Sequence, residues 1–299
     1  MAAGNFAFNN PAFQERRPGL TPPPAQQAGT QTQYATTAHQ GIDAATSAQL
    51  EGMYAAPPAG SIDTGRMTVE DTVHKTLALF AVLVVTAAVG WLWTMSTVAT
   101  AGAPTMMPWI IGMIGGFGLA MAVTFTSRKK VRPGLILGYA AFEGLFVGGI
   151  SGFFEFIWPG VVIQAVLATL AVVGATLALF ANGKVRVSAR ANKIFMVAIV
   201  GYMIFGLLNL VLMWTGVAPG AFGLYSQTFM GIPLGLVIGV VVVIMAAYSL
   251  VQDFDLVQQG VRNGAPREMG WIGGFGIMVT VVWLYVEILR ILAILRGDN

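Results

Sequence analysis

The sequence predicts an all-α polytopic membrane protein, a bundle of seven transmembrane helices with its N-terminus in the cytoplasm. Of its 299 residues, 56% are hydrophobic and only 10% are charged, and its mean hydropathy is +0.73. A soluble domain carries about 25% charged residues, so this chain lacks the polar surface of one. Two patterns complete the prediction: long apolar runs divide the chain after its first quarter, and basic residues occupy alternate connectors.

The first segment, residues 1–66, differs in composition from the rest and is expected to be a disordered cytoplasmic tail. It is rich in Ala, Gln, Thr, Gly and Pro and has no helical apolar period. Such a segment buries too little apolar area to offset its ordering entropy. Residues 67–299 form the predicted transmembrane domain. Thr68, a capping hydroxyl ahead of Glu70 and Asp71, marks the expected start of its first helix.

The transmembrane domain contains seven apolar runs of the length that a bilayer requires. A hydrocarbon core about 30 Å thick needs roughly 20 apolar residues per helix. The runs lie near residues 77–98, 106–127, 134–157, 161–181, 194–214, 229–251 and 271–295. Only helices and closed barrels satisfy the backbone within lipid. Because the runs lack the two-residue alternation of barrel strands, we expect helices.

The connectors between the runs predict the orientation in the membrane. Basic residues gather in every second connector: Arg128, Lys129, Lys130 and Arg132; Lys184, Arg186, Arg190 and Lys193; Arg262 and Arg267. The other connectors, near 99–105, 158–160 and 215–228, contain no Lys or Arg. The positive-inside rule therefore predicts a multi-pass protein of the cell (plasma) membrane, with the N-terminus cytoplasmic and the C-terminus outside.

Composition also excludes several functional classes. The chain has no cysteine, which rules out disulfides, thiolate metal sites and a catalytic cysteine. Its 16 Lys and Arg residues are scattered, so no nucleic-acid surface is expected. The sequence shows no clustered zinc ligands, nucleotide-binding loop or serine-nucleophile motif. We therefore expect no cofactor, no firm metal site and no enzymatic activity.

The informative residues are the ionisable groups inside the spans, because each costs a few kcal/mol to insert. They are Glu143 in span three, Asp253 and Asp255 at the end of span six, and Glu287 and Arg290 in span seven. Glu143 lies about 15 Å deep, counting from the start of its span, and is either a functional acid or a structural hydrogen-bonding group. Glu287 and Arg290 share a helix face and can neutralise each other. Asp255 is expected to be a solvated residue.

Two spans carry glycine at every fourth position. The residues are Gly144, Gly148 and Gly152 in span three, and Gly231, Gly235 and Gly239 in span six. Small residues at this spacing allow two membrane helices to approach closely. Spans three and six are therefore expected at the centre of the bundle.

From about Leu77 to its end, the chain resembles the Bax inhibitor-1, or transmembrane Bax inhibitor motif, family, and within it a bacterial branch with a long N-terminal tail. The resemblance is carried by four segments: Tyr139-Ala140-Ala141-Phe142-Glu143-Gly144 with Gly148 and Ser151; Gln164-Ala165 with Thr169; Gln252-Asp253-Phe254-Asp255; and Trp283-Leu284-Tyr285-Val286-Glu287-Ile288-Leu289-Arg290-Ile291-Leu292. It implies a seven-helix protein with a cytoplasmic N-terminus.

The resemblance also implies a function, a pH-sensitive calcium leak. In that family, one acid from span six and one from span seven share a proton and gate a central pore. By matching position these would be Asp253 and Glu287, with calcium as the permeant ion held transiently between them. Two carboxylates in contact do not both ionise easily, and ionised carboxylates suit calcium.

The spacing between Asp253 and Glu287 is longer than the family pattern. A symmetric hairpin turning near Gly264 would place Asp253 opposite Phe275 and Glu287 about 18 Å higher. Glu143 is then the alternative second acid for Glu287. A different class of function is also open, a non-conducting regulator that binds other membrane proteins, such as a quality-control protease, through its N-terminal tail.

Overall fold

The computed structural model describes residues 65–218 and 222–297. Within these ranges it contains seven helices long and apolar enough to cross a membrane, which confirms the predicted all-α, polytopic fold. Their bounds are α4 Val69–Met95, α6 Met107–Thr126, α7 Pro133–Ile157, α8 Val161–Ala181, α9 Ala189–Trp214, α10 Leu234–Arg262 and α11 Met269–Gly297. The predicted tail, apart from its last two residues, lies outside the described residues.

The first helix begins where the capping signal indicated. The Thr68 side chain accepts a hydrogen bond of 3.1 Å from the backbone N–H of Asp71. Just before the helix, the backbone N–H of Met67 donates to the carbonyl of Ala265 at 2.8 Å, and Arg66 forms an isolated antiparallel bridge with Pro266. The entry to α4 is thus hydrogen-bonded to the connector between α10 and α11.

The sixth span differs from its predicted range, 229–251. A short antiparallel hairpin of β1 (Thr228–Phe229) and β2 (Ile232–Pro233) precedes it, and α10 then runs eleven residues past the predicted end. Gly231 occupies the hairpin turn with φ of +80°, and no atom lies within 4 Å of where its Cβ would be. The prediction that Gly231 packs between helices is wrong, because it lies in a turn that requires positive φ.

The other five predicted packing glycines do lie at close helix contacts. In α7, a Cβ on Gly144 would collide with the Thr86 side chain and the Leu83 carbonyl of α4, and one on Gly148 with the Ala87 carbonyl. Gly152 faces the Thr94 methyl group at 3.1 Å. In α10, Gly235 and Gly239 face Ile294 and Ile291 of α11. At Gly144 and Gly148 the backbones of α7 and α4 therefore approach closely, whereas Gly152, Gly235 and Gly239 make room for side chains of the neighbouring helix.

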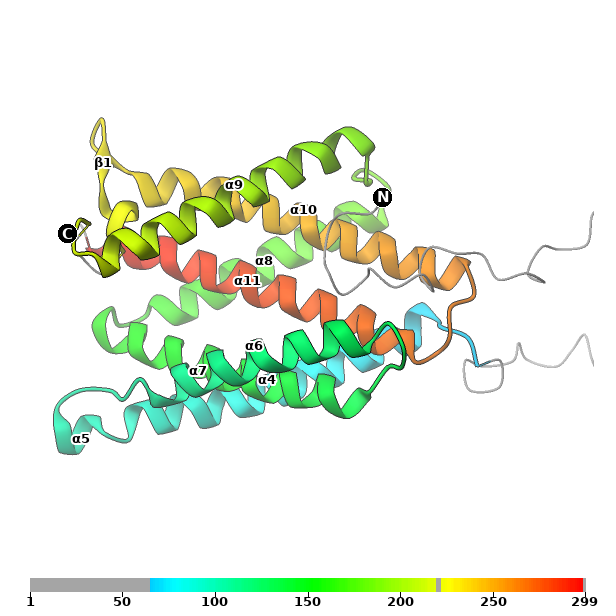
Figure 1. Ribbon diagram of the computed structural model, residues 1–299, viewed down its shortest axis with the longest axis horizontal. Coiled ribbons are helices and arrows are strands. Elements are labelled where there is room, and N and C mark those ends of the chain that lie inside the picture. The colour runs from blue at the N-terminus through cyan, green and yellow to red at the C-terminus, as the bar shows by residue number, and fades with distance from the viewer. Residues whose placement is uncertain (1–64, 219–221, 298–299) are drawn as a thin grey trace, which may run out of the picture.

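Helix α11 lies at the centre of the molecule. It contacts α4, α7, α8 and α10, and Figure 1 shows it crossing between the α4–α6–α7 group and the α9–α10 pair. Over the most apolar 18-residue stretch of each helix, 56% of α11 is buried but only 11% of α9. The sequence suggested spans three and six as central, and the structure adds span seven as the helix that joins them.

Two further short elements lie in the connectors of the bundle. A single turn, α5 (Val98–Ala101), follows α4, and a 3-10 turn, η2 (Gly223–Ser226), follows α9. Arg296, near the end of α11, donates to the carbonyl of Trp158 at 3.4 Å and to the Gln164 side chain at 3.1 Å. This arginine therefore lies at the end of the bundle that carries the connector 158–160, opposite the basic connectors.

Candidate functional site

Asp253 lies at the interface between α10 and α11. Its side chain has no exposed surface, and its Oδ2 accepts a hydrogen bond of 2.6 Å from the hydroxyl of Thr280. Thr280 is itself 3% exposed. The carboxylate is therefore held inside the bundle by a neighbouring helix, which is the position expected of a functional rather than a solvated acid.

Glu287 lies further along the same helix, in a second polar cluster. It is 3% exposed and pairs with Arg290 one turn away. The hydroxyl of Tyr202 in α9 donates to Glu287 at 3.1 Å and accepts from Arg290 at 3.3 Å. The Arg290 guanidinium also lies 3.9 Å from the centroid of the Tyr225 ring. The mutual neutralisation that the sequence suggested is present, and Tyr202 extends it to α9.

Asp253 and Glu287 are therefore not in direct contact. Thr280, the partner of Asp253, precedes Glu287 by seven residues, which is about 10.5 Å along the helix. On α10, Gly239 faces Glu287: a Cβ on Gly239 would lie 3.5 Å from Glu287 Oε1. Fourteen residues, about 21 Å of helix, separate Gly239 from Asp253. The departure in spacing thus has a structural counterpart: the two acids lie at least two helical turns apart in depth and cannot share a proton directly.

Glu143 lies on another side of the bundle, between α7 and α6. Its Oε2 is 3.1 Å from the position of a Cβ on Gly116 in α6. Two contacts set the register of α7 against α11: the Tyr139 and Phe275 rings, with centroids 4.8 Å apart, and the Ser151–Tyr285 hydrogen bond of 2.6 Å. By this register Glu143 lies near the depth of Thr280. Glu143 therefore lies at about the depth of Asp253 and not beside Glu287, where the alternative pairing of the two glutamates would need it.

Two other acids are satisfied at helix ends. Asp255 accepts a hydrogen bond of 2.7 Å from Gln259 and lies 3.8 Å from Arg262, so it belongs to the basic end of α10. Glu155 accepts hydrogen bonds from the backbone N–H groups of Gly160 at 2.5 Å and Val162 at 3.1 Å. It therefore caps the start of α8, a structural role that its place near the end of a span did not reveal.

Besides Tyr202, α9 carries two further polar side chains that form hydrogen bonds at other depths, and together with the acid clusters we call these groups the polar seam. Near the start of α9, Asn192 accepts hydrogen bonds from Tyr248 at 2.6 Å and from Gln252 at 3.1 Å. Near its end, Asn209 accepts from the backbone N–H of Leu224 at 2.6 Å. From Asn192 to Asn209 is 17 residues, about 26 Å of helix. A polar seam thus runs along α9, α10 and α11 over most of the thickness of a bilayer core.

Sequence reasoning missed several members of this seam: Asn192, Tyr202, Asn209, Tyr248 and Thr280. Tyr202, Asn209 and Tyr248 stand inside apolar runs, which was a usable signal, whereas Asn192 lies among the basic residues just before its run. Thr280 gave none, because a threonine in a membrane helix ordinarily bonds to its own backbone, as Thr169 does with the carbonyl of Ala165.

The described residues do not include a preformed metal site. Across residues 65–218 and 222–297, no three His, Cys, Asp or Glu side chains lie close enough together to hold an ion. Asp253 and Glu287 each supply oxygen atoms beside a hydroxyl group. Such oxygen atoms suit brief contacts with a hard cation.

Comparison with known proteins identifies the family. No curated protein and no solved structure matches this chain. The sequence profile described as Bax inhibitor 1 like matches residues 10–297, and so reaches well into the tail, which the resemblance based on motifs had left uncovered. Since that match spans nearly the whole chain and the seven-helix fold agrees with it, this protein belongs to the Bax inhibitor 1 like family.

Proposed function

We propose that the protein is a slow cation leak, with calcium among the permeant ions. The observation that carries the proposal is the polar seam along α9, α10 and α11. Buried polar groups at membrane depth are costly and mark ion pathways. This seam contains two buried acids, each beside a hydroxyl group, and Thr280, the partner of Asp253, lies about 10.5 Å from Glu287 along α11.

The geometry supports a mechanism with two steps along α11. A cation would exchange its hydration for the oxygen atoms of Asp253 and Thr280, and then for those of Glu287 and Tyr202. In this structure Arg290 pairs with Glu287, so a cation at the second step competes with the guanidinium. We propose that the arrangement in which Arg290 pairs with Glu287 is the closed one.

The same pair supplies the proposed pH sensitivity. Protonating Glu287 would remove the negative charge that holds Arg290, and would free both groups to reorient. Because Tyr202 bonds to both, such a change would reach α9, the least buried helix. We propose that the pH response acts through the attachment of α9. This replaces the direct proton sharing that the family pattern implies.

The test is calcium flux into liposomes that contain the purified full chain, at pH 6 and pH 8. We expect a flux above that of empty liposomes, reduced by Asp253→Asn and altered in its pH dependence by Glu287→Gln. Asp255→Asn is the matched control, because Asp255 lies beside Arg262 and outside the seam. Absence of flux at both pH values, or equal flux in all variants, would overturn the proposal.

A second candidate function, a regulator that binds other membrane proteins, is supported by one observation. The chain leading from the N-terminal tail is hydrogen-bonded to the connector between the two acid-bearing helices, through Met67 and Ala265. A partner bound to the tail would thus act on α10 and α11. If the tail serves only to bind partners, deleting residues 1–64 should leave the leak unchanged. Loss of the leak on deletion would show that the tail is needed for conduction and does not act only as a partner-binding segment.

We further propose that the protein lies in the plasma membrane with its N-terminus in the cytoplasm. The basic connectors lie at one end of the bundle, the end where α10 meets α11 (Figure 1). Positive residues favour the cytoplasmic side. The opposite end, with the hairpin of β1 and β2, then faces outside.

A further inference from the structure

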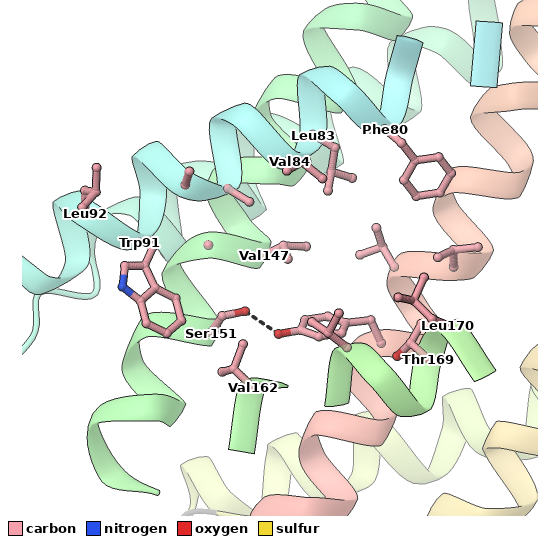
Figure 2. A pocket seen from close by; sticks show the side chains of 17 residues that line it. Phe80, Leu83, Val84, Trp91, Leu92, Val147, Ser151, Val162, Thr169 and Leu170 are labelled. Carbon is pink, nitrogen blue, oxygen red and sulfur yellow. Dashed lines mark hydrogen bonds between the residues drawn. The ribbon is translucent and has the colours of Figure 1, made fainter. Parts of the chain in front are cut away.

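An open groove of about 590 Å³ runs along the surface between α4 and α8. Helices α7 and α11 form its floor, and Figure 2 shows the α4 side chains above it and those of α8 below. Phe80 and Leu170 lie towards one end, and Trp91 and Val162 towards the other. The groove is separate from the polar seam, which involves other faces of α10 and α11.

The chemistry of the lining selects an occupant without polar groups. Its side chains are almost entirely apolar, and the hydroxyl groups among them belong to Ser151, Tyr285 and Thr169. Ser151 and Tyr285 bond to each other at 2.6 Å, and Thr169 donates to the carbonyl of Ala165 at 2.7 Å. Since these hydroxyl groups already have partners, a ligand gains little from offering a donor or acceptor here.

The dimensions of the groove select an elongated, thin occupant. From Phe80 to Leu92 it follows twelve residues of α4, a length of about 18 Å. The groove has a volume of about 590 Å³. A helix about 10 Å across occupies roughly 1,400 Å³ over the same length. A transmembrane helix of a partner or of a second copy would therefore lie over the groove, whereas a single hydrocarbon chain can lie inside it.

The surroundings supply an occupant of the required shape. On both sides the walls continue into apolar side chains that face outward: Val84 is 62% exposed on α4, and Leu170 is 61% exposed on α8. For helices that span a membrane, this surface meets lipid hydrocarbon. One leaflet supplies about half of the 30 Å hydrocarbon core, or about 15 Å. The groove, at about 18 Å, is slightly longer than that.

From these observations we propose that the groove between α4 and α8 is a binding site for one acyl chain of a bilayer lipid. The acyl chain lies over the hydrogen-bonded side chains of Ser151 and Tyr285 and against Val281 and Val282 of α11. It fills the space that separates α4 from α8, and so couples the packing of these two helices to the lipid. This inference stands independently of ion conduction.

The test is photocrosslinking in phosphatidylcholine vesicles that contain a small fraction of phosphatidylcholine with a diazirine on one acyl chain. The full-length protein is reconstituted in these vesicles and irradiated, and the lipid adducts are located by peptide mass spectrometry. We expect the adduct yield at groove residues such as Trp91 to be at least threefold that at Val85, which is 64% exposed but outside the groove.

Two variants fill the groove from opposite walls, Ala88→Phe from α4 and Val166→Phe from α8. Each should lower the groove adducts at least threefold, whereas the matched control Val85→Phe should leave them unchanged. Equal yields at Trp91 and Val85 in the unaltered protein, or groove yields that neither variant changes, would overturn the proposal. So would crosslinks that join the groove to a second copy of the chain, because a protein surface would then occupy it.

Discussion

Thr280 on α11 donates a hydrogen bond of 2.6 Å to Asp253 on α10, and neither side chain is more than 3% exposed. This contact fixes the register of the two acid-bearing helices. Thr280, the partner of Asp253, lies two turns from Glu287 along α11. The position of Thr280 therefore decides that the two acids lie at different depths, as the proposed stepwise path requires.

Replacing Thr280 with valine should destabilise the protein. The variant keeps the side-chain volume but removes the hydroxyl that bonds to the buried carboxylate of Asp253. Losing a hydrogen bond to a buried polar group costs about 1–3 kcal/mol. Unfolding in mixed detergent micelles measures the change in the free energy of unfolding. Thr280→Ser, which keeps the hydroxyl, should retain most of the stability that the valine variant loses. Equal stability of the valine and serine variants would contradict the assignment.

Replacing Tyr202 with phenylalanine should loosen α9. The Tyr202 hydroxyl contacts both Glu287 and Arg290, and a hydrogen bond between membrane helices contributes on average about 0.6 kcal/mol. Amide hydrogen exchange in α9 should then increase about threefold. The matched control is Tyr285→Phe, whose hydroxyl bonds to Ser151 of α7. If both variants change α9 equally, Tyr202 has no special role in its attachment.

Replacing Gly144 with alanine should disrupt the contact between α7 and α4. A Cβ at this position would overlap the Thr86 side chain and the Leu83 carbonyl, and such overpacking costs typically about 1–3 kcal/mol. Gly174 in α8 is the matched control, because no atom lies within 4 Å of its Cβ position. There Gly→Ala should stabilise the helix by about 0.5–1 kcal/mol. In detergent unfolding, the free energy of unfolding should fall for Gly144→Ala and rise for Gly174→Ala.

Replacing Asp71 with asparagine should weaken the junction between α4 and the α10–α11 connector. Asp71 accepts from the Arg267 side chain at 2.9 Å and pairs with Lys75, whose ammonium also donates to the Arg267 carbonyl at 2.6 Å. The change leaves Lys75, only 8% exposed, without its carboxylate. The free energy of unfolding should fall by about 1.5–3 kcal/mol, the usual contribution of hydrogen bonds to charged groups. Glu70→Gln, at an exposed position in the same turn, should leave the unfolding free energy unchanged.

The absence of native cysteine allows a direct test of orientation. Single cysteines at Lys129 and Thr100 lie in connectors at opposite ends of α6. A membrane-impermeant maleimide added to intact cells should label Thr100→Cys and spare Lys129→Cys until the membrane is opened. The reverse pattern would contradict the proposed cytoplasmic N-terminus.

Much of the fold could be predicted because membrane helices follow local rules. The fourth span, expected at 161–181, coincides with α8 Val161–Ala181, and the third differs by one residue at its start. Backbone groups in lipid must pair within their own helix, so apolar length alone predicts each span. The sixth span departed at both ends, because Pro233 and the hairpin delay its start, and because α10 extends past Asp253 beyond its apolar run.

By itself the sequence determined the seven spans, the charged connectors, the buried acids and five of the six packing glycines, since each depends on composition or on spacing along one helix. Only the tertiary structure decided which side chains meet. The pairing of Asp253 with Thr280, the attachment of Tyr202 to Glu287 and the groove beneath α4 all depend on helix register and crossing. These are set by side-chain packing among helices far apart in the sequence, which no local pattern records.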